Sequence, residues 1–280
     1  MAAVSHLQEV KDGNRFTFGE NWAQFLKILD EDRILRAENS LRKMLKVDSL
    51  KGKTFLDIGS GSGLFSLAAR RLGAKVHSFD FDPESVACTN KLRMRYFPDD
   101  TNWVIERGSA LDTDYLNSLG KWDIVYSWGV LHHTGDMELA LENASNMVAE
   151  DGDLFIAIYN DQGRPSCYWL SVKNFYNKLP KALRWVILWP ATIRLWGPTT
   201  LRDILKGQPF HTWRNYPKIS SRGMSPWRDV VDWVGGLPFE VATPDEIFHL
   251  FQKRGFNLTE LKTDDGHGCN EFVFHRKTHS

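Results

Sequence analysis

The sequence predicts an α/β fold, a doubly wound and mostly parallel seven-stranded sheet of the Rossmann-like kind, with an N-terminal helical cap and a helical insertion. Three observations predict it. Short apolar segments alternate with segments of helical periodicity through the first half of the chain. A glycine-rich turn joins the first strand to its helix, and two strands near the C-terminus complete the sheet.

The elements follow in order. Apolar residues recur at helical spacing from Phe18 to Leu45, with a break at Asp30-Glu31-Asp32, and predict two helices. A helix over 243–254, with Thr243 as its N-cap, precedes the closing strand pair. The expected strands are 53–58, 75–79, 103–106, 123–127, 153–159, 256–261 and 271–276. The other expected helices are 63–72, 83–96 and 137–148.

About 80 residues separate the fifth strand from the closing unit, far more than the ~2 to 6 of a typical strand–helix loop. This stretch is therefore expected to be an insertion with its own structure. The predicted organisation is a helical cap over 1–50, a cofactor-binding core over 51–162, a basic and tryptophan-rich insertion over 163–242, and a helix with a β-hairpin over 243–280.

The overall composition excludes several classes of protein. The formal net charge is zero, with 35 basic and 35 acidic side chains, so the total favours neither a nucleic-acid nor a membrane partner. Three scattered cysteines indicate neither a disulfide framework nor a metal site. The longest compact apolar run, Trp185 to Trp189, is cut by Pro190, and the first residues lack an apolar signal segment. A cytoplasmic protein without a transmembrane helix is expected.

The segment from Phe55 to Gly63 runs from a buried strand into a turn whose glycines let the backbone approach a ligand. A dinucleotide fingerprint would require a third glycine at position 64, which is Leu64. The spacing is therefore GxGxG, which argues against a nicotinamide or flavin enzyme. Asp80, about 20 residues past the glycines, stands where an acid can accept both ribose hydroxyls of a nucleoside.

With Asp57, the turn reads DxGxGxG and resembles motif I of the class I S-adenosylmethionine-dependent methyltransferases, above all the small-molecule enzymes of quinone and natural-product biosynthesis. Asp80 matches that family's motif II, and Phe81 could stack on the adenine. Asp82 is interpreted as a helix N-cap before Pro83. The resemblance implies S-adenosyl-L-methionine as cofactor and a cofactor site that includes Asp57, Gly59, Ser60, Gly61, Gly63, Asp80, Phe81, Ser109, Ala110, Ser127 and Trp128.

Ser109 stands where relatives commonly place an aspartate that contacts the adenine, so the backbone at Ala110, or Asp112, is an alternative contact. The stretch from Ser127 to Gly135 resembles motif IV with its frequent Leu-His-His. A histidine suits proton removal from an acceptor because its pKa lies near neutral. The candidate bases are His133, His132 and His267, and no base is required for an anionic or thioether acceptor.

Loops that follow strands are expected to carry the acceptor site. Candidates after the fifth strand are Tyr159, Asn160 and Asp161, and the hairpin turn offers Asp265, His267 and Asn270.

In the insertion, twelve basic residues lie between Gly163 and Arg228, against the single acid Asp203, together with six tryptophans. We therefore expect a lid over a small, anionic acceptor, methylated on oxygen, nitrogen or sulfur. A lipid-linked or membrane acceptor, with peripheral contact through 181–197, is the second alternative, and RNA is the third, since no recognisable RNA-binding module is present. A different class of function, a regulatory subunit that only binds S-adenosylmethionine, remains open. The sequence indicates no oligomeric state.

Overall fold

The computed structural model describes residues 6–219, 225–264, 266 and 268–277. Seven strands in this part of the chain form one sheet in the order β3-β2-β1-β4-β5-β7-β6. Strands β1 to β5 are parallel and β7 is antiparallel to both its neighbours. The strands are β1 (Thr54–Ile58), β2 (Lys75–Asp80), β3 (Trp103–Arg107), β4 (Trp122–Trp128), β5 (Val148–Tyr159), β6 (Phe256–Lys262) and β7 (Cys269–Arg276). The predicted doubly wound, mostly parallel seven-stranded sheet of the Rossmann-like kind is confirmed.

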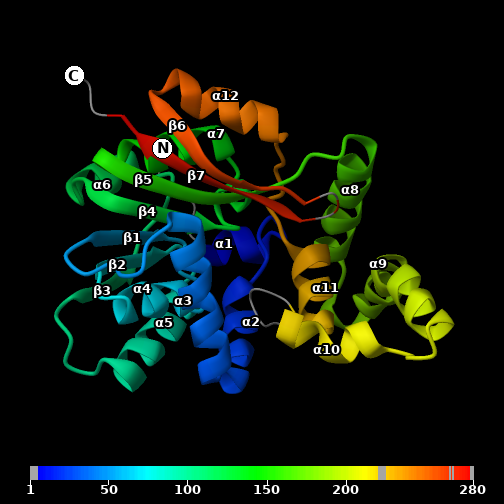
Figure 1. Ribbon diagram of the computed structural model, residues 1–280. Helices are drawn as coiled ribbons and strands as arrows, with labels where there is room; N and C mark the ends of the chain where they lie inside the picture. Colours follow the sequence, from blue (N-terminus) through cyan, green and yellow to red (C-terminus); the bar gives the residue numbers. More distant parts are fainter. Residues whose placement is uncertain (1–5, 220–224, 265, 267, 278–280) are drawn as a thin grey trace.

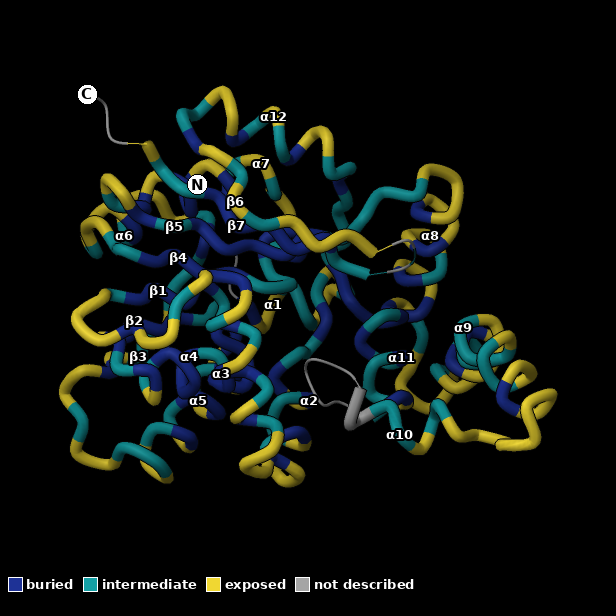
Figure 2. The backbone as a smooth tube through the Cα atoms, in the orientation of Figure 1, coloured by how far each residue is buried: buried dark blue, intermediate teal, exposed yellow. Residues whose placement is uncertain are grey.

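Helices cover both faces of this sheet (Figure 1). They are α1 (His6–Lys11), α2 (Phe18–Phe25), α3 (Glu31–Leu45), α4 (Leu64–Arg71), α5 (Pro83–Tyr96), α6 (Thr113–Ser118), α7 (Met137–Asn146) and α12 (Pro244–Lys253), with short 3₁₀ turns at Leu26–Ile28 and Leu131–His133. One buried cluster joins α3 and α4 to the sheet through Leu41 and Leu67, and another joins α7 and α12 through Leu141 and Phe251. The two clusters form the dark interior in Figure 2.

In its described residues, the insertion forms four helices beside the carboxyl ends of the parallel strands, on the right of Figure 1. They are α8 (Arg164–Lys178), α9 (Trp185–Leu205), α10 (His211–Ile219) and α11 (Pro226–Gly235), with a 3₁₀ turn at Lys181–Leu183. Their core includes Trp169, Leu188 and Val234, and it also takes in Phe16 from the N-terminal segment. Helix α2 lies between the sheet and this insertion (Figure 1) and contacts α11.

Several element boundaries differ from the prediction. Helix α7 ends at Asn146 and β5 already begins at Val148, because edge residues of β5 pair with β4 from Trp122↔Val148 onward. Helix α9 continues through Pro190, so the predicted interruption there is wrong. Proline removes one hydrogen-bond donor, but the neighbouring residues Leu188 and Ala191 are buried in the core of the insertion and keep the helix continuous. Short helices α1 and α6 were not expected.

Capping residues set other boundaries as predicted. The side chain of Asp82 accepts from the backbone N–H of Glu84, so it caps α5. Thr243 and Glu246 form a reciprocal capping box at the start of α12. Within the described residues, no helix is long and apolar enough to cross a bilayer.

Substitution of Gly63 tests how tightly the turn after β1 packs against α5. The φ of Gly63 is +80°, and a Cβ added there would lie 2.8 Å from the Cα of Thr89 on α5. Gly52 has a φ of +83° with open space around it. Gly52→Ala should cost about 1 kcal/mol through its left-handed backbone alone. Gly63→Ala should cost a further ~1–3 kcal/mol through overpacking. Urea unfolding measures both, and equal losses would show that α5 does not constrain the turn.

Candidate functional site: a methyl-donor pocket beside an aromatic acceptor chamber

A cavity of about 1150 Å³ opens at the carboxyl ends of the parallel strands. It is larger than the ~300–1,000 Å³ of a typical small-molecule site, so two small ligands can lie in it side by side. Its walls come from the N-terminal segment, the turn after β1, the ends of β2 and β4, the insertion, and the β6–β7 hairpin.

The turn after β1 is held by two backbone hydrogen bonds to the end of β2. The N–H groups of Gly59 and Ser60 both donate to the carbonyl of Phe79 on β2, at 2.9 and 3.0 Å. Gly59 has a φ of +78°, and a Cβ there would lie 2.4 Å from Val130. A Cβ on Gly61 would lie 3.0 Å from the indole nitrogen of Trp22. The turn is therefore enclosed by the loop after β4 and by α2.

Asp80 ends β2 and ties this turn in place. Its Oδ2 accepts from the N–H of Gly61 and its Oδ1 from the N–H of Asp82, each at 2.9 Å. Burial raises the pKa of Asp80 to about 6, against the opposing effect of these two hydrogen bonds. At neutral pH the carboxylate is ionised and keeps lone pairs for two further donors. It therefore suits the paired hydroxyls of a ribose.

Asp57 lies behind the turn at the end of a buried polar chain. Its carboxylate accepts from the hydroxyl of Ser66, which lies 2.7 Å from the hydroxyl of Ser78. The indole N–H of Trp103 in turn donates to Ser78 at 2.9 Å. Burial raises the pKa of Asp57 to about 7, with the Ser66 hydrogen bond acting in the opposite direction. This series of hydrogen bonds orients the side chain of Asp57, which also lines the cavity.

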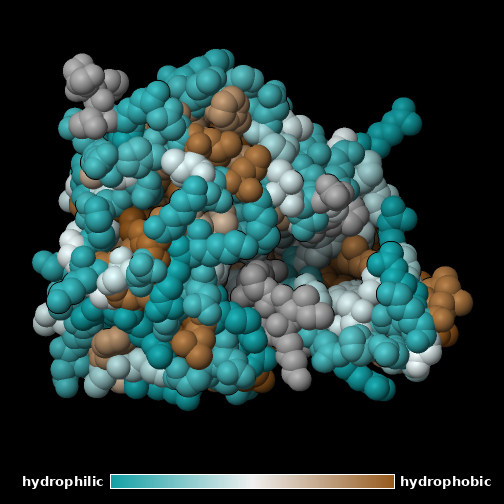
Figure 3. Space-filling view, viewed as in Figure 1, coloured by the Kyte–Doolittle hydropathy of each residue, from teal (hydrophilic) through white to brown (hydrophobic). Residues whose placement is uncertain are grey.

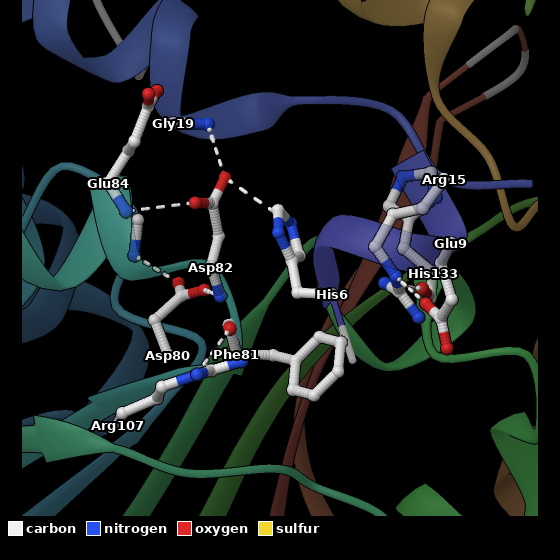
Figure 4. A network of polar contacts seen from close by, with 11 residues as sticks. His6, Glu9, Arg15, Gly19, Asp80, Phe81, Asp82, Glu84, Arg107 and His133 are labelled. Carbon is white, nitrogen blue, oxygen red and sulfur yellow. Dashed lines mark hydrogen bonds and ion pairs between the residues drawn. The ribbon is translucent and has the colours of Figure 1, made fainter. Parts of the chain in front are cut away.

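The N-terminal segment closes over this pocket (Figure 4). Arg15 donates to the carbonyls of His133, at 2.9 Å, and Thr134, at 3.3 Å, and it pairs with Glu9. Its guanidinium also lies 5.0 Å from the centre of the Phe81 ring. The segment thereby connects the end of β2 to the loop that carries His133. Sequence reasoning missed Arg15 and Glu9, because no periodicity or motif shows that this segment folds back over the sheet.

The two adjacent histidines have different surroundings. His132 is fully buried, and its Nδ1 accepts from the N–H of Tyr159 at 3.4 Å. His133 lines the cavity, and its Nδ1 lies 2.5 Å from the carbonyl oxygen of Pro238. A carbonyl can only accept, so Nδ1 carries the proton, and in the neutral ring Nε2 is the basic nitrogen.

The part of the cavity that lies between the insertion, the N-terminal segment and the end of β5 is aromatic. The aromatic residues that line it are Phe16, Phe18, Tyr159, Trp196, Tyr216 and Trp233. The Tyr159 ring lies 5.2 Å from the His133 ring, edge to face, and 5.1 Å from the Trp233 ring. This chamber therefore offers flat ring surfaces next to an imidazole, as a planar organic molecule requires.

Charged side chains in the lining are mostly acidic. They are Glu9, Asp57, Asp80, Asp82, Asp112, Asp114, Asp229, Asp232, Asp264 and Glu271, against Arg15 and Lys262. Among the insertion's basic residues whose side chains the structure describes, none lines the cavity. The basic charge of the insertion therefore lies elsewhere on the molecule and gives no reason to expect an anionic acceptor.

The family follows from comparison with known proteins. A family model described as a methyltransferase domain matches residues 29–261, which is most of the chain.

The chain belongs to this methyltransferase family.

It is an S-adenosylmethionine-dependent methyltransferase of class I, as the glycine motif predicted. Among curated proteins, it is 28% identical over 182 residues to the ubiquinone biosynthesis O-methyltransferase of Xanthomonas campestris pv. campestris (strain B100), covering 62% of this chain and 73% of that protein. The corresponding protein of Xanthomonas oryzae pv. oryzae (strain PXO99A) is 26% identical over 181 residues, with the same two coverages.

Solved structures share the fold at low identity. Magnesium protoporphyrin IX methyltransferase from Synechocystis PCC 6803, with bound SAM, has a TM-score of 0.56 and 11% identity, covering 99% of this chain and 100% of that one. PKMT2 from Rickettsia typhi, in complex with AdoHcy, has a TM-score of 0.55 and 13% identity, covering 86% and 52%.

The residues of this methyltransferase fit the methyl donor. The carboxylate of Asp80 can accept ribose hydroxyls, the glycine turn lets a ligand approach the backbone, and the cavity has room for more than one ligand. Most of the residues predicted to bind the cofactor line this cavity. They are Asp57, Gly59, Ser60, Gly61, Asp80, Phe81, Ser109, Ala110 and Trp128.

Two predicted cofactor residues lie outside the lining. Gly63 packs against Thr89, and the hydroxyl of Ser127 donates to the carbonyl of Ile58 at 2.9 Å. Gly63 and Ser127 therefore support the residues that line the pocket without lining it themselves. In the loop after β3, the hydroxyl of Ser109 accepts from the N–H of Leu111, and Asp112 caps α6 while lining the cavity.

Predicted acceptor residues also divide into two groups. Tyr159 lines the cavity, whereas Asn160 and Asp161 do not. The side chain of Asn160 accepts from Asn270 at 3.1 Å and donates to the carbonyl of Asp264 at 3.2 Å. These bonds tie the loop after β5 to the β6–β7 hairpin, which reaches the cavity through Asp264 and Glu271. His267 and Asp265 lie outside the described residues.

Lys173 of α8 is fully buried behind the aromatic chamber. Its ammonium donates to the carbonyl of Trp233 and lies 4.5 Å from the ring centres of both Trp233 and Phe239. Burial lowers the pKa of Lys173 to about 7, while the nearby carboxylate of Asp232 acts in the opposite direction. Lys173 thus supports one wall of the chamber without lining it.

Lys173→Met should change how stability depends on pH. In the wild type the folded chain releases this proton near pH 7, whereas the unfolded chain keeps it to about pH 10.4. Between these values the unfolded state binds more protons, so wild-type stability should rise with pH relative to the variant, by up to about 1.4 kcal/mol per pH unit. Urea unfolding from pH 7 to 9 measures this, with exposed Lys178→Met as control. If the free energy of unfolding changed with pH in the same way in all three proteins, the aromatic faces would be shown to keep Lys173 charged.

Asp80 should make donor binding depend on pH. Below about pH 6 its carboxyl is protonated and can no longer accept from both ribose hydroxyls. Calorimetry should show the affinity for S-adenosylmethionine falling by up to ~10-fold per pH unit below pH 6. Asp80→Asn should weaken binding ~10–100-fold at pH 7.5, as expected for a lost charge-assisted hydrogen bond. The exposed cavity residue Asp114 provides the control Asp114→Asn. Unchanged affinity in Asp80→Asn would contradict the assignment.

Proposed function

We propose that this methyltransferase transfers the methyl group to a hydroxyl oxygen of a small aromatic acceptor, with His133 as general base. The observation that carries the proposal is the hydrogen bond from Nδ1 of His133 to the carbonyl of Pro238, at 2.5 Å. It holds the imidazole in the tautomer whose Nε2 can take a proton. A base at this position favours a protonated nucleophile such as a phenolic hydroxyl.

The chamber beside His133 supports an aromatic acceptor. Tyr159 and Trp233 present ring faces and edges there, and Phe18 lies 5.0 Å from the His133 ring. Aromatic walls bind planar molecules through area and ring geometry rather than charge. The curated relatives named above are O-methyltransferases of ubiquinone biosynthesis, and this agrees with oxygen as the acceptor atom.

The proposed reaction divides the work between the two parts of the cavity. When bound, S-adenosylmethionine supplies an electrophilic methyl group on a sulfonium. Asp80 and the glycine turn hold its nucleoside end, and Tyr159 and Trp233 hold the acceptor ring. As the new O–C bond forms and the S–C bond breaks, the hydroxyl proton passes to Nε2 of His133. Positioning of the two ligands supplies much of the rate.

A small anionic acceptor is the second candidate. Arg15 and Lys262 lie in the described lining and could pair with a carboxylate or phosphate. The ten acidic residues of the same lining oppose such a ligand, so an uncharged acceptor is preferred. No residue of the described cavity singles out a nitrogen or sulfur acceptor, a lipid-linked acceptor or RNA.

An acceptor screen tests the proposed chemistry. The full chain is incubated with donor carrying a labelled methyl group and with matched panels of phenols, amines, thiols, and carboxylate- or phosphate-bearing compounds. Label in phenols as methyl ethers is the expected result. Donor binding without label in any panel would favour the regulatory-subunit alternative, and label confined to amines or thiols would overturn the choice of oxygen.

His133→Asn is the sharpest single substitution. The asparagine amide can still donate to the Pro238 carbonyl but cannot take a proton, so folding should be kept while the base is lost. We expect kcat to fall ~10²–10⁴-fold with donor affinity within a few-fold of wild type. Exposed His249 gives the control His249→Asn. A kcat within a few-fold of wild type would show that His133 is not the base.

A further inference from the structure

Helix α9 presents an apolar stripe to the outside of the molecule. Seven large apolar side chains on it are more than two-fifths exposed. They are Trp185 (58%), Val186 (46%), Trp189 (57%), Ile193 (68%), Leu201 (58%), Ile204 (51%) and Leu205 (80%). Val186, Trp189, Ile193, Leu201 and Ile204 recur at intervals of three, four or eight residues, which places them along one side of a helix.

Most of this stripe is distinct from the surface with which α9 joins the fold, and Trp189 lies at its border, with its ring centre 6.0 Å from that of Trp227 on α11. Leu188 and Ala191 are buried in the core of the insertion, and Leu195 and Trp196 line the cavity. Figure 3 shows hydrophobic side chains projecting at the edge of the molecule where α9 lies in Figure 1. Apolar side chains gathered in one place, rather than scattered singly, mark an interaction site.

The charge around the stripe is positive. Arg194 and Arg202 are exposed on α9 itself, Lys206 is exposed directly after it, and Lys178 is exposed at the end of α8. From residue 163 to 219 the sequence contains one acid, Asp203, and that side chain is 7% exposed and accepts from the N–H and hydroxyl of Thr212. The outer surface of α8 to α10 in the described residues therefore carries basic groups with no exposed acid among them.

We propose that α9 docks this stripe on the surface of an anionic lipid bilayer. Tryptophans and aliphatic side chains enter the boundary between headgroups and acyl chains, while arginine and lysine pair with lipid phosphates. The helix lies along the surface. It does not span the bilayer, since no described helix is apolar enough to do so, and its own Pro190 and Pro198 weaken its backbone hydrogen bonding.

The charge pattern favours an anionic bilayer over a second copy of the chain as the partner of the stripe. Two copies meeting through this stripe would bring like-charged Arg194, Arg202 and Lys206 together without exposed acids from the same helices to pair with them. An anionic surface meets the same residues with opposite charge. Because Leu195 lines the cavity from the side of α9 opposite the stripe, docking also sets the acceptor chamber about one helix diameter, ~10 Å, from the lipid.

Vesicle flotation with the full chain tests the proposal. The two probes are phosphatidylcholine vesicles and phosphatidylcholine vesicles that contain a minority of phosphatidylglycerol. We expect at least ~10-fold stronger partitioning to the anionic vesicles, lost at high salt. Equal partitioning to both, or none to either, would overturn the proposal.

Paired variants locate the contact. Trp189→Glu with Ile193→Glu should lower partitioning at least ~10-fold, and Arg194→Glu with Arg202→Glu should remove the preference for anionic lipid. Met94→Glu with Val104→Glu, exposed elsewhere on the molecule, is the matched control. Calorimetric binding of S-adenosylmethionine checks that each variant is folded. Unchanged partitioning of the Trp189→Glu, Ile193→Glu variant would overturn the proposal. So would a wild-type protein that binds no vesicles but forms a dimer, if the same variant is a monomer.

Discussion

Two neighbouring carboxylates at the end of β2 hold the donor site together. Asp80 accepts from Gly61 in the first turn and from the backbone of Asp82. Asp82 accepts from Glu84 at the start of α5 and from Gly19 at the start of α2. These two neighbouring side chains therefore join the end of β2 to the turn after β1, to α5 and to the N-terminal segment. Loss of the Asp80 carboxylate would remove the anchor of the turn, and loss of the Asp82 carboxylate would release the N-terminal segment that covers it.

The cover over the site depends on the insertion as well. Asn21 of α2 donates to Asp232 of α11 and accepts from Arg228 at 2.9 Å. The N–H of Phe16 donates to the carbonyl of Leu237, and its ring joins the buried core of α8, α9 and α11. The N-terminal segment and the insertion are thus one structural unit above the sheet, although they are far apart in the sequence. This unit supplies most of the aromatic chamber.

The sequence could predict that the proposed donor-site residues lie together around one cavity because its signals are local. Asp57, the glycines and Asp80 lie on consecutive elements, and the parallel sheet must bring the strand ends together. Asp82 and Thr243 were predicted as caps for the same reason. Arg15 and Trp233 could not be found, because their positions depend on contacts between distant segments. The basic insertion was interpreted as a lid for an anion because composition alone does not show which side of a helix a charge occupies.

A crystal structure of the chain with S-adenosylhomocysteine tests the central claim most directly. The account predicts the ribose hydroxyls on the carboxylate of Asp80, the amino-acid end beside the glycine turn and Asp57, and the sulfur facing the chamber formed by His133, Tyr159 and Trp233. A ligand bound away from Asp80, or one whose sulfur faces away from His133, would contradict it.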